Sequence, residues 1–313
     1  MSGPGGPPMH LVVVLAVVSL PLVIGATLIA VLARRPDPAP SDAAAAARRH
    51  AGAVNVLALI CLFASMAVGL GVLTGSSADG RQGIYLGLVP AAAGLAFAAV
   101  QGLGELTWPR PSGTIRRAPL TRRTTSDVAP GRLRRATWCW SALTAVTLVA
   151  CGAASDDGRG ITRTFTDGSA GAGPFPGWFY GVPLLLATTA VLLASETVLG
   201  LVARRPAVMD AAPEWDLGLR RTSSRRLLRG VQLVLGWTAA GVLFIAGAAV
   251  HSVGVGGSAN GIATGAAGYA AVGIASMVLG VVAWLGSTAA VFLPARPVVA
   301  DGAAALSPHG LLA

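Results

Sequence analysis

The chain alternates long apolar stretches with shorter segments that hold almost all of its charged residues. A helix of about 20 apolar residues crosses a bilayer core of roughly 30 Å, and backbone groups cannot be left unpaired in hydrocarbon. Seven stretches predict transmembrane helices, over residues 11–33, 51–74, 83–107, 137–154, 179–203, 231–251 and 265–292. We therefore expect an all-α membrane bundle, a single domain over 1–313 with a short cytoplasmic tail at 294–313.

The arginines are distributed unevenly between the two sides that these spans define. Of the 23 basic residues, all of them arginine, only Arg81, Arg159 and Arg163 lie on one side. Because cationic loops are retained in the cytoplasm, this places the N-terminus outside and the C-terminus inside. Arg34 and Arg35 follow the first stretch and no cation precedes it, so we expect a retained anchor rather than a signal peptide.

The composition narrows the function classes. A chain without lysine that is rich in Ala, Gly, Pro and Val is typical of a high-GC bacterial genome, which indicates the bacterial plasma membrane. The net charge of +10 fits topology and anionic lipid headgroups, so we expect no nucleic-acid partner. Without lysine the chain has neither a retinal Schiff base nor a Walker phosphate loop.

The histidines and cysteines predict no metal and no cofactor. His10, His50, His251 and His309 lie at the ends of spans or in tails, where they cannot ligate a haem inside the bundle. The three cysteines form no disulfide framework, and we expect them to act as small apolar residues.

Recurring arginine motifs suggest an internal repeat. Four spans end at an Arg-Pro pair, which predicts one lead helix followed by three hairpins, unless Arg-Pro is only what high-GC coding supplies at helix ends. Two cytoplasmic loops carry paired arginines before hydroxyl residues, Arg122 and Arg123 in one and Arg220 and Arg221 in the other. They would either bind phosphate of anionic headgroups or belong to short interfacial helices with hydroxyl N-caps.

Glu196 is the charge that topology does not explain. It precedes Arg204 by eight residues, about 12 Å of helix, and an ionisable group at that depth is costly unless it faces the bundle interior. Counting back nine residues from each Arg-Pro arginine places Gln101, Glu196 and Ser287 at equivalent positions, which predicts a shared polar layer. Asn55 and Gln232 lie near the inner ends of their spans and are expected to join it.

Glu105 is the second acid of interest. It lies three residues before Trp108 and five before Arg110, so we expect it to reach headgroup water and pair there. The longest outer segment, 155–177, is glycine-rich and is too short for a folded domain, although it is long enough to act as a lid.

The run Gly104-Glu105-Leu106-Thr107-Trp108-Pro109-Arg110-Pro111, followed by the arginine-rich loop, resembles seven-span membrane proteins of high-GC bacteria and implies no activity. The size, the seven spans and the carboxyls in helices are also similar, in architecture alone, to integral membrane terpene cyclases. That resemblance implies an acid embedded in the membrane that starts a carbocation cascade on a lipophilic substrate.

Three functions follow from these residues. The first is a transporter or carrier in which Glu196 couples transport to protons. The second is a cyclase with Glu196 as proton donor and Glu105 as second acid, oriented by Gln101 and Asn55, with Trp237 and Trp284 stabilising cations. The third is a scaffold or accessory subunit. The expected partners are the bilayer and a lipophilic small molecule.

Overall fold

The computed structural model describes Gly25 and residues 39–75, 81–109, 123–165, 168–259 and 266–292. The first predicted span, apart from Gly25, lies outside these residues, as do Arg110, Arg122 and the predicted tail.

Six long helices make up most of the described chain. They are α2 (Asp42–Gly75), α3 (Gln82–Leu106), α5 (Gly131–Ala154), α6 (Trp178–Arg204), α7 (Pro213–Ala259) and α8 (Ala266–Phe292). Each is long and apolar enough to cross a membrane, so six of the seven predicted spans have a helix in the structure. The protein therefore has the architecture of a helical membrane bundle.

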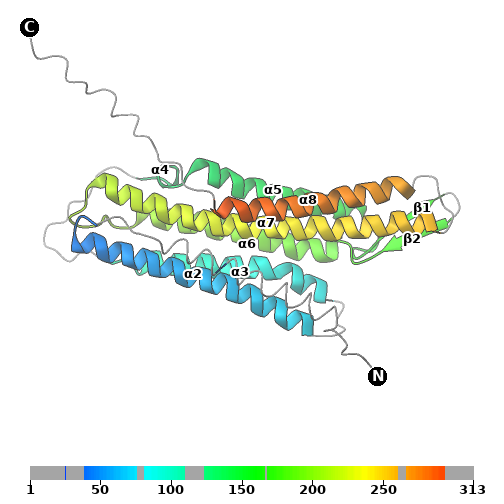
Figure 1. Ribbon diagram of the computed structural model, residues 1–313, viewed down its shortest axis with the longest axis horizontal. Helices are drawn as coiled ribbons and strands as arrows, with labels where there is room; N and C mark the ends of the chain where they lie inside the picture. The colour runs from blue at the N-terminus through cyan, green and yellow to red at the C-terminus, as the bar shows by residue number, and fades with distance from the viewer. Residues whose placement is uncertain are drawn as a thin grey trace, which may run out of the picture.

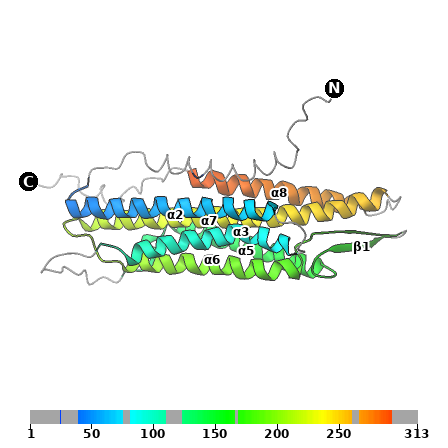
Figure 2. The same cartoon turned by 90° about the horizontal axis from the view of Figure 1, so that it is seen from below.

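The helix α7 is the centre of the bundle and packs against each of the other five long helices (Figures 1 and 2). Its Leu228, Val231 and Leu235 are buried in the largest hydrophobic core, together with Phe97 of α3. We call the end near Arg205, where α6 ends, the arginine end. The opposite end, which carries the two strands, is the hairpin end (Figure 1).

The helices α2, α5 and α7 begin six or more residues earlier than the apolar pattern predicts. The helix α7 begins at Pro213 rather than 231, with a proline and two acids in its first turn, residues that favour a helix N-terminus. Ser41 precedes α2, and its Oγ accepts a bond from the backbone N–H of Ala44 at 3.2 Å, as an N-cap does. Polar residues thus extend these helices beyond the apolar stretches, and the loop predicted around Arg220 is helical.

Glycines allow α7 and α8 to approach closely. A Cβ on Gly247 would meet the carbonyl oxygen of Gly273 at 2.7 Å, whereas a Cβ on Gly241 of the same helix would meet nothing within 4 Å. We therefore expect Gly247→Val to destabilise the bundle by about 1–3 kcal/mol and Gly241→Val to change it little. Thermal unfolding of both variants in detergent checks this, and equal midpoints would contradict the close packing.

The outer segment forms a small sheet rather than an irregular loop. Strand β1 (Ile161–Phe165) pairs antiparallel with β2 (Gly168–Ala172), with Ile161 opposite Ala172. Both strands contact α7, and the ring of Phe165 packs edge-on against Tyr269 of α8 at 5.8 Å between centroids. The hairpin therefore sits on the ends of α7 and α8, at the place where the sequence suggested a lid.

Candidate functional site

Glu196 forms an ion pair on the flank of the bundle. Its carboxylate accepts bonds from Arg134 of α5, at 3.0 Å from Nε and 2.9 Å from Nη2, and from the indole N–H of Trp138 at 3.1 Å. The side chains of Glu196 and Arg134 are 21% and 36% exposed. The expectation that Glu196 faces the bundle interior and is oriented by Gln101 and Asn55 is therefore wrong, because α5 supplies an arginine within reach of its carboxylate.

The two amides that were expected to orient this acid bond to each other instead. Gln101 Nε2 on α3 donates to Asn55 Oδ1 on α2 at 3.2 Å, and both residues are buried. Nearby, a Cβ on Gly104 would collide with the side chain of Val54, so the helices are in close contact there. This buried pair ties α2 to α3 and satisfies one polar group of each residue.

Ser287, Trp237 and Trp284 lie in the seam between α7 and α8. Ser287 Oγ donates to the carbonyl of Trp284 at 3.1 Å within its own helix. The indole N–H of Trp237 donates to Thr288 Oγ1 at 2.9 Å, and the two indole rings are 6.2 Å apart. Both tryptophans therefore pack helix against helix.

The predicted polar layer does not form. Gln101 bonds across α2 and α3, Glu196 across α5 and α6, and Ser287 within α8, so equivalent sequence positions meet different neighbours. Gln232 is buried on α7, and its Oε1 has no hydrogen-bond partner among the described residues.

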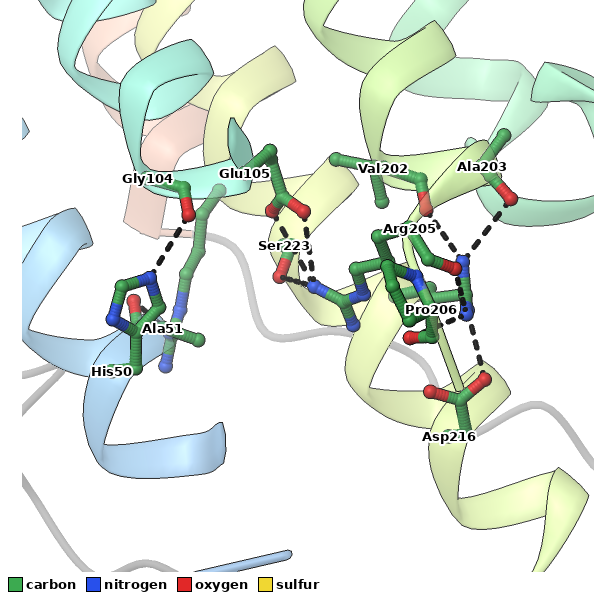
Figure 3. A network of polar contacts seen from close by, with 12 residues as sticks. His50, Ala51, Gly104, Glu105, Val202, Ala203, Arg205, Pro206, Asp216 and Ser223 are labelled. Atoms are coloured by element: carbon green, nitrogen blue, oxygen red, sulfur yellow. Dashed lines mark hydrogen bonds and ion pairs between the residues drawn. The ribbon is translucent and has the colours of Figure 1, made fainter. Parts of the chain in front are cut away.

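Glu105 belongs to a buried cluster at the arginine end (Figure 3). Arg205 Nη1 lies 3.4 Å from both carboxylate oxygens of Glu105 and 3.4 Å from Ser223 Oγ. The Arg205 guanidinium also lies over the ring of Trp108, 3.9 Å from its centroid. The side chains of Arg205 and Glu105 are only 1% and 7% exposed, so the expectation that Glu105 reaches headgroup water is wrong.

His50 closes the same cluster from α2. Its Nε2 lies 2.9 Å from the carbonyl oxygen of Gly104, and its ring meets Trp108 edge-on at 5.6 Å between centroids. The cavity beside it, lined also by Gln101, Glu105 and others, has a volume of about 10 Å³. That volume holds at most one water molecule, so this cluster is a packed polar contact rather than a ligand pocket.

Arg220 was expected at the lipid headgroups. It is fully buried on α7 instead, and its side chain caps the carbonyl groups at the end of α6. Its Nη1 and Nη2 donate to four carbonyls, those of Val202, Ala203, Arg205 and Pro206, at 2.8–3.3 Å. Its Nε donates to Asp216 Oδ2 at 2.8 Å, one turn away on α7. The headgroup prediction for Arg220 is wrong, because the last carbonyls of a helix lack intrahelical partners and this arginine supplies them.

The other predicted headgroup arginines differ from one another. Arg123 pairs with Asp216 Oδ2 at 2.7 Å, and Arg221 is partly exposed with one long bond of 3.4 Å to the carbonyl of Asp127. Next to them, the short helix α4 (Thr125–Val128) has the predicted hydroxyl N-cap, Thr124. The Thr124 backbone N–H donates to Asp127 at 2.7 Å and holds the pKa of that carboxyl below its usual value.

An apolar groove lies at the hairpin end of the bundle. Its volume is about 600 Å³, and α5, α7, α8 and the hairpin segment line it, among them Ala150, Leu243, Val250, Phe175 and Tyr269. Two further lining residues, Val146 and Val272, are 68% and 60% exposed, so the groove opens on the flank of the bundle.

Among the described residues that line this groove, Arg163 of β1 is the only charged one. Its Nη2 donates to the carbonyl of Ala154 at 2.9 Å, and its Nη1 lies 3.8 Å from Asp156. In the sequence, Arg163 stood out only as one of the three arginines on the outer side. The sequence offered one signal for it, because Arg163 lies two positions after the apolar Ile161 in a segment that is otherwise polar and rich in glycine.

Neither metal-binding geometry nor similarity to known proteins assigns a function to these residues. Within the described residues, no group of three His, Cys, Asp or Glu side chains is placed to hold a metal ion. Comparisons with protein-family models, with curated proteins and with solved structures found no match.

Proposed function

We propose that this protein resides in the bacterial plasma membrane and binds a small lipophilic molecule in the groove at the hairpin end. The groove itself carries the proposal, because its volume of about 600 Å³ falls within the range of about 300–1,000 Å³ typical of small-molecule sites. Its walls are mostly apolar and its mouth faces the flank of the bundle, where the hydrocarbon of a bilayer would lie. A ligand dissolved in the membrane can enter from the side.

The arginine distribution supports an orientation for this site. The described arginine end carries most of the described cations and would face the cytoplasm. The hairpin end, with Arg81, Arg159 and Arg163, would face outside. The groove then lies in the outer half of the bilayer.

A carrier is the form of this function that the arrangement supports best. Ion pairs connect segments at the arginine end, Glu105 with Arg205 and Asp216 with Arg123, while the groove is open at the other end. Alternating access requires one side closed while the site is open to the other. We assign proton coupling to Glu196, because a partly exposed pair such as the one with Arg134 separates at little cost.

The cyclase alternative has less support. No carboxyl is among the described residues that line the groove, and neither are Trp237 and Trp284. Glu105 and Glu196, the proposed acids, are each paired with an arginine elsewhere. A scaffold or accessory subunit, the third possibility, would bind no ligand in the groove.

Filling the groove with an indole tests the binding proposal. Val272 and Val282 lie on the same helix with 60% and 58% exposure, but only Val272 lines the groove. In nanodiscs, a photoreactive hexadecanol should label groove residues about tenfold less in Val272→Trp than in the unaltered protein, a loss of about 1.4 kcal/mol in binding. Labelled peptides are quantified by mass spectrometry.

Val282→Trp serves as the matched control, since it adds the same indole to the lipid-facing surface outside the groove. Labelling that falls equally in both variants would point to a general effect on the bundle. Labelling that falls in neither would overturn the proposed site and leave the scaffold alternative.

A further inference from the structure

We infer that the groove selects a single-tailed amphiphile with an anionic headgroup, whose charge is held by Arg163 at the mouth. This inference rests on the proposed function, since it names the class of ligand for the same groove. The first observation is the arrangement of the walls. Between Val146 and Ala154, which are eight positions and about 12 Å of helix apart, α5 lines the groove, and the charged Arg163 lies at the Ala154 end.

Arg163 is positioned for an anion. Two backbone carbonyls orient its guanidinium, Ala154 at 2.9 Å and Thr162 at 2.6 Å, and neither cancels its charge. A guanidinium has five N–H donors and binds phosphate or carboxylate oxygens in a fixed fork. Donors thus remain for a headgroup at the point where the apolar walls end.

Asp156, the carboxylate nearest to Arg163, is only weakly paired with it. Asp156 lies 3.8 Å from Arg163 and its side chain is 53% exposed, so this is a weak surface pair that a ligand headgroup can replace. Asp156 is also occupied otherwise, because its Oδ2 accepts the backbone N–H of Thr162 at 2.6 Å. Nearby Asp157 accepts the N–H groups of Arg159 and Gly160, which lowers its pKa and keeps it ionised in the turn.

The positions of the apolar walls and of Arg163 predict how the ligand is oriented in the groove. The tail lies along Ala150 and Val250 toward the middle of the bundle, and the headgroup lies at the hairpin, at the depth of the outer bilayer surface. Fatty acids and alkyl or isoprenyl phosphates share this chemistry. A neutral alcohol of the same length would fill the walls but leave Arg163 without its partner.

Two photoreactive probes test the inference, hexadecyl phosphate and hexadecanol with the same mid-chain diazirine, in nanodiscs of phosphatidylcholine. The unaltered protein should be labelled about fivefold more by the phosphate, the preference expected for one partly exposed charge contact. Arg163→Gln should equalise the two probes. Asp156→Asn should raise labelling by the phosphate alone, because Arg163 then lacks its competing carboxylate while Asn can still accept from Thr162.

The outcomes separate this inference from the proposed function. If Arg163→Gln keeps the preference for phosphate, or Asp156→Asn does not raise it, the anionic headgroup is wrong. Val272→Trp still tests the groove in that case, through the loss of labelling by hexadecanol. Should Arg163→Gln fail to fold, the Asp156→Asn result decides, since that variant retains the arginine and its backbone contacts.

Discussion

Replacing Arg220 by methionine is expected to destabilise the protein by about 3–5 kcal/mol, the cost of removing one partner of a buried charge pair. The change removes one of the two arginines that pair with the buried Asp216, leaving Arg123, and it removes the donors for four carbonyls at the end of α6. Thermal unfolding of the purified protein in detergent measures the loss. A folded but strongly destabilised protein is the expected result.

Arg221 supplies a matched control for this variant. It is the next residue of α7, is partly exposed and makes one long bond to the carbonyl of Asp127. Arg221→Met should change the stability by no more than about 0.5 kcal/mol, as surface substitutions usually do. Equal midpoints for Arg220→Met and Arg221→Met would show that the carbonyl cap does not stabilise this end of the bundle.

The two acids should respond very differently to the loss of charge. Glu105→Gln leaves the buried Arg205 without its ion-pair partner and should cost about 3–5 kcal/mol. Glu196→Gln affects a partly exposed pair with Arg134 and should cost no more than about 1 kcal/mol. Unfolding measurements on both variants, made under identical conditions, compare the same chemical change in two environments.

A double variant separates the ion pair from other effects of Glu105→Gln. Arg205→Met alone should also destabilise, but Glu105→Gln combined with Arg205→Met should recover part of the loss, because neither charge is then left alone. Additive losses would contradict a direct coupling between these side chains.

The variant Glu196→Gln also tests the proposed carrier. Because Glu196→Gln should leave the protein stable, a loss of proton-dependent transport in that variant would reflect coupling rather than misfolding. Transport that is unchanged would remove Glu196 from the mechanism. The binding of ligand in the groove would still be tested by Val272→Trp.

Only part of the candidate site could be predicted from the sequence. Asn55 and Gln101 were expected in a polar layer with Glu196; both are buried, and the structure brings them together without it. Glu196 was expected to join them, but its partner Arg134 lies 62 positions away, and the rotation of α6 about its axis decides which neighbour it meets. Arg205, the partner of Glu105, lies 100 positions away, so no local spacing could identify the pair.

The burial of Arg220 was likewise not predictable from the sequence. Its position after an Arg-Pro stop and before hydroxyl residues predicted a place at the headgroups, either in a loop or in a short interfacial helix. The residues around it instead extend α7, which turns Arg220 back onto the end of α6. Whether an arginine is exposed or buried depended on a helix that lies next to it only in the folded protein.

The sequence by itself determined where the long apolar helices lie and which ends gather the arginines, since the length of a span and the sign of its flanks are local properties. Six of those spans are helices in the described structure. Only the tertiary structure decided the partners of Glu105, Glu196 and Arg220 and formed the groove beside Arg163. Contacts between helices depend on rotation, register and close approach, and these arise when distant segments pack together.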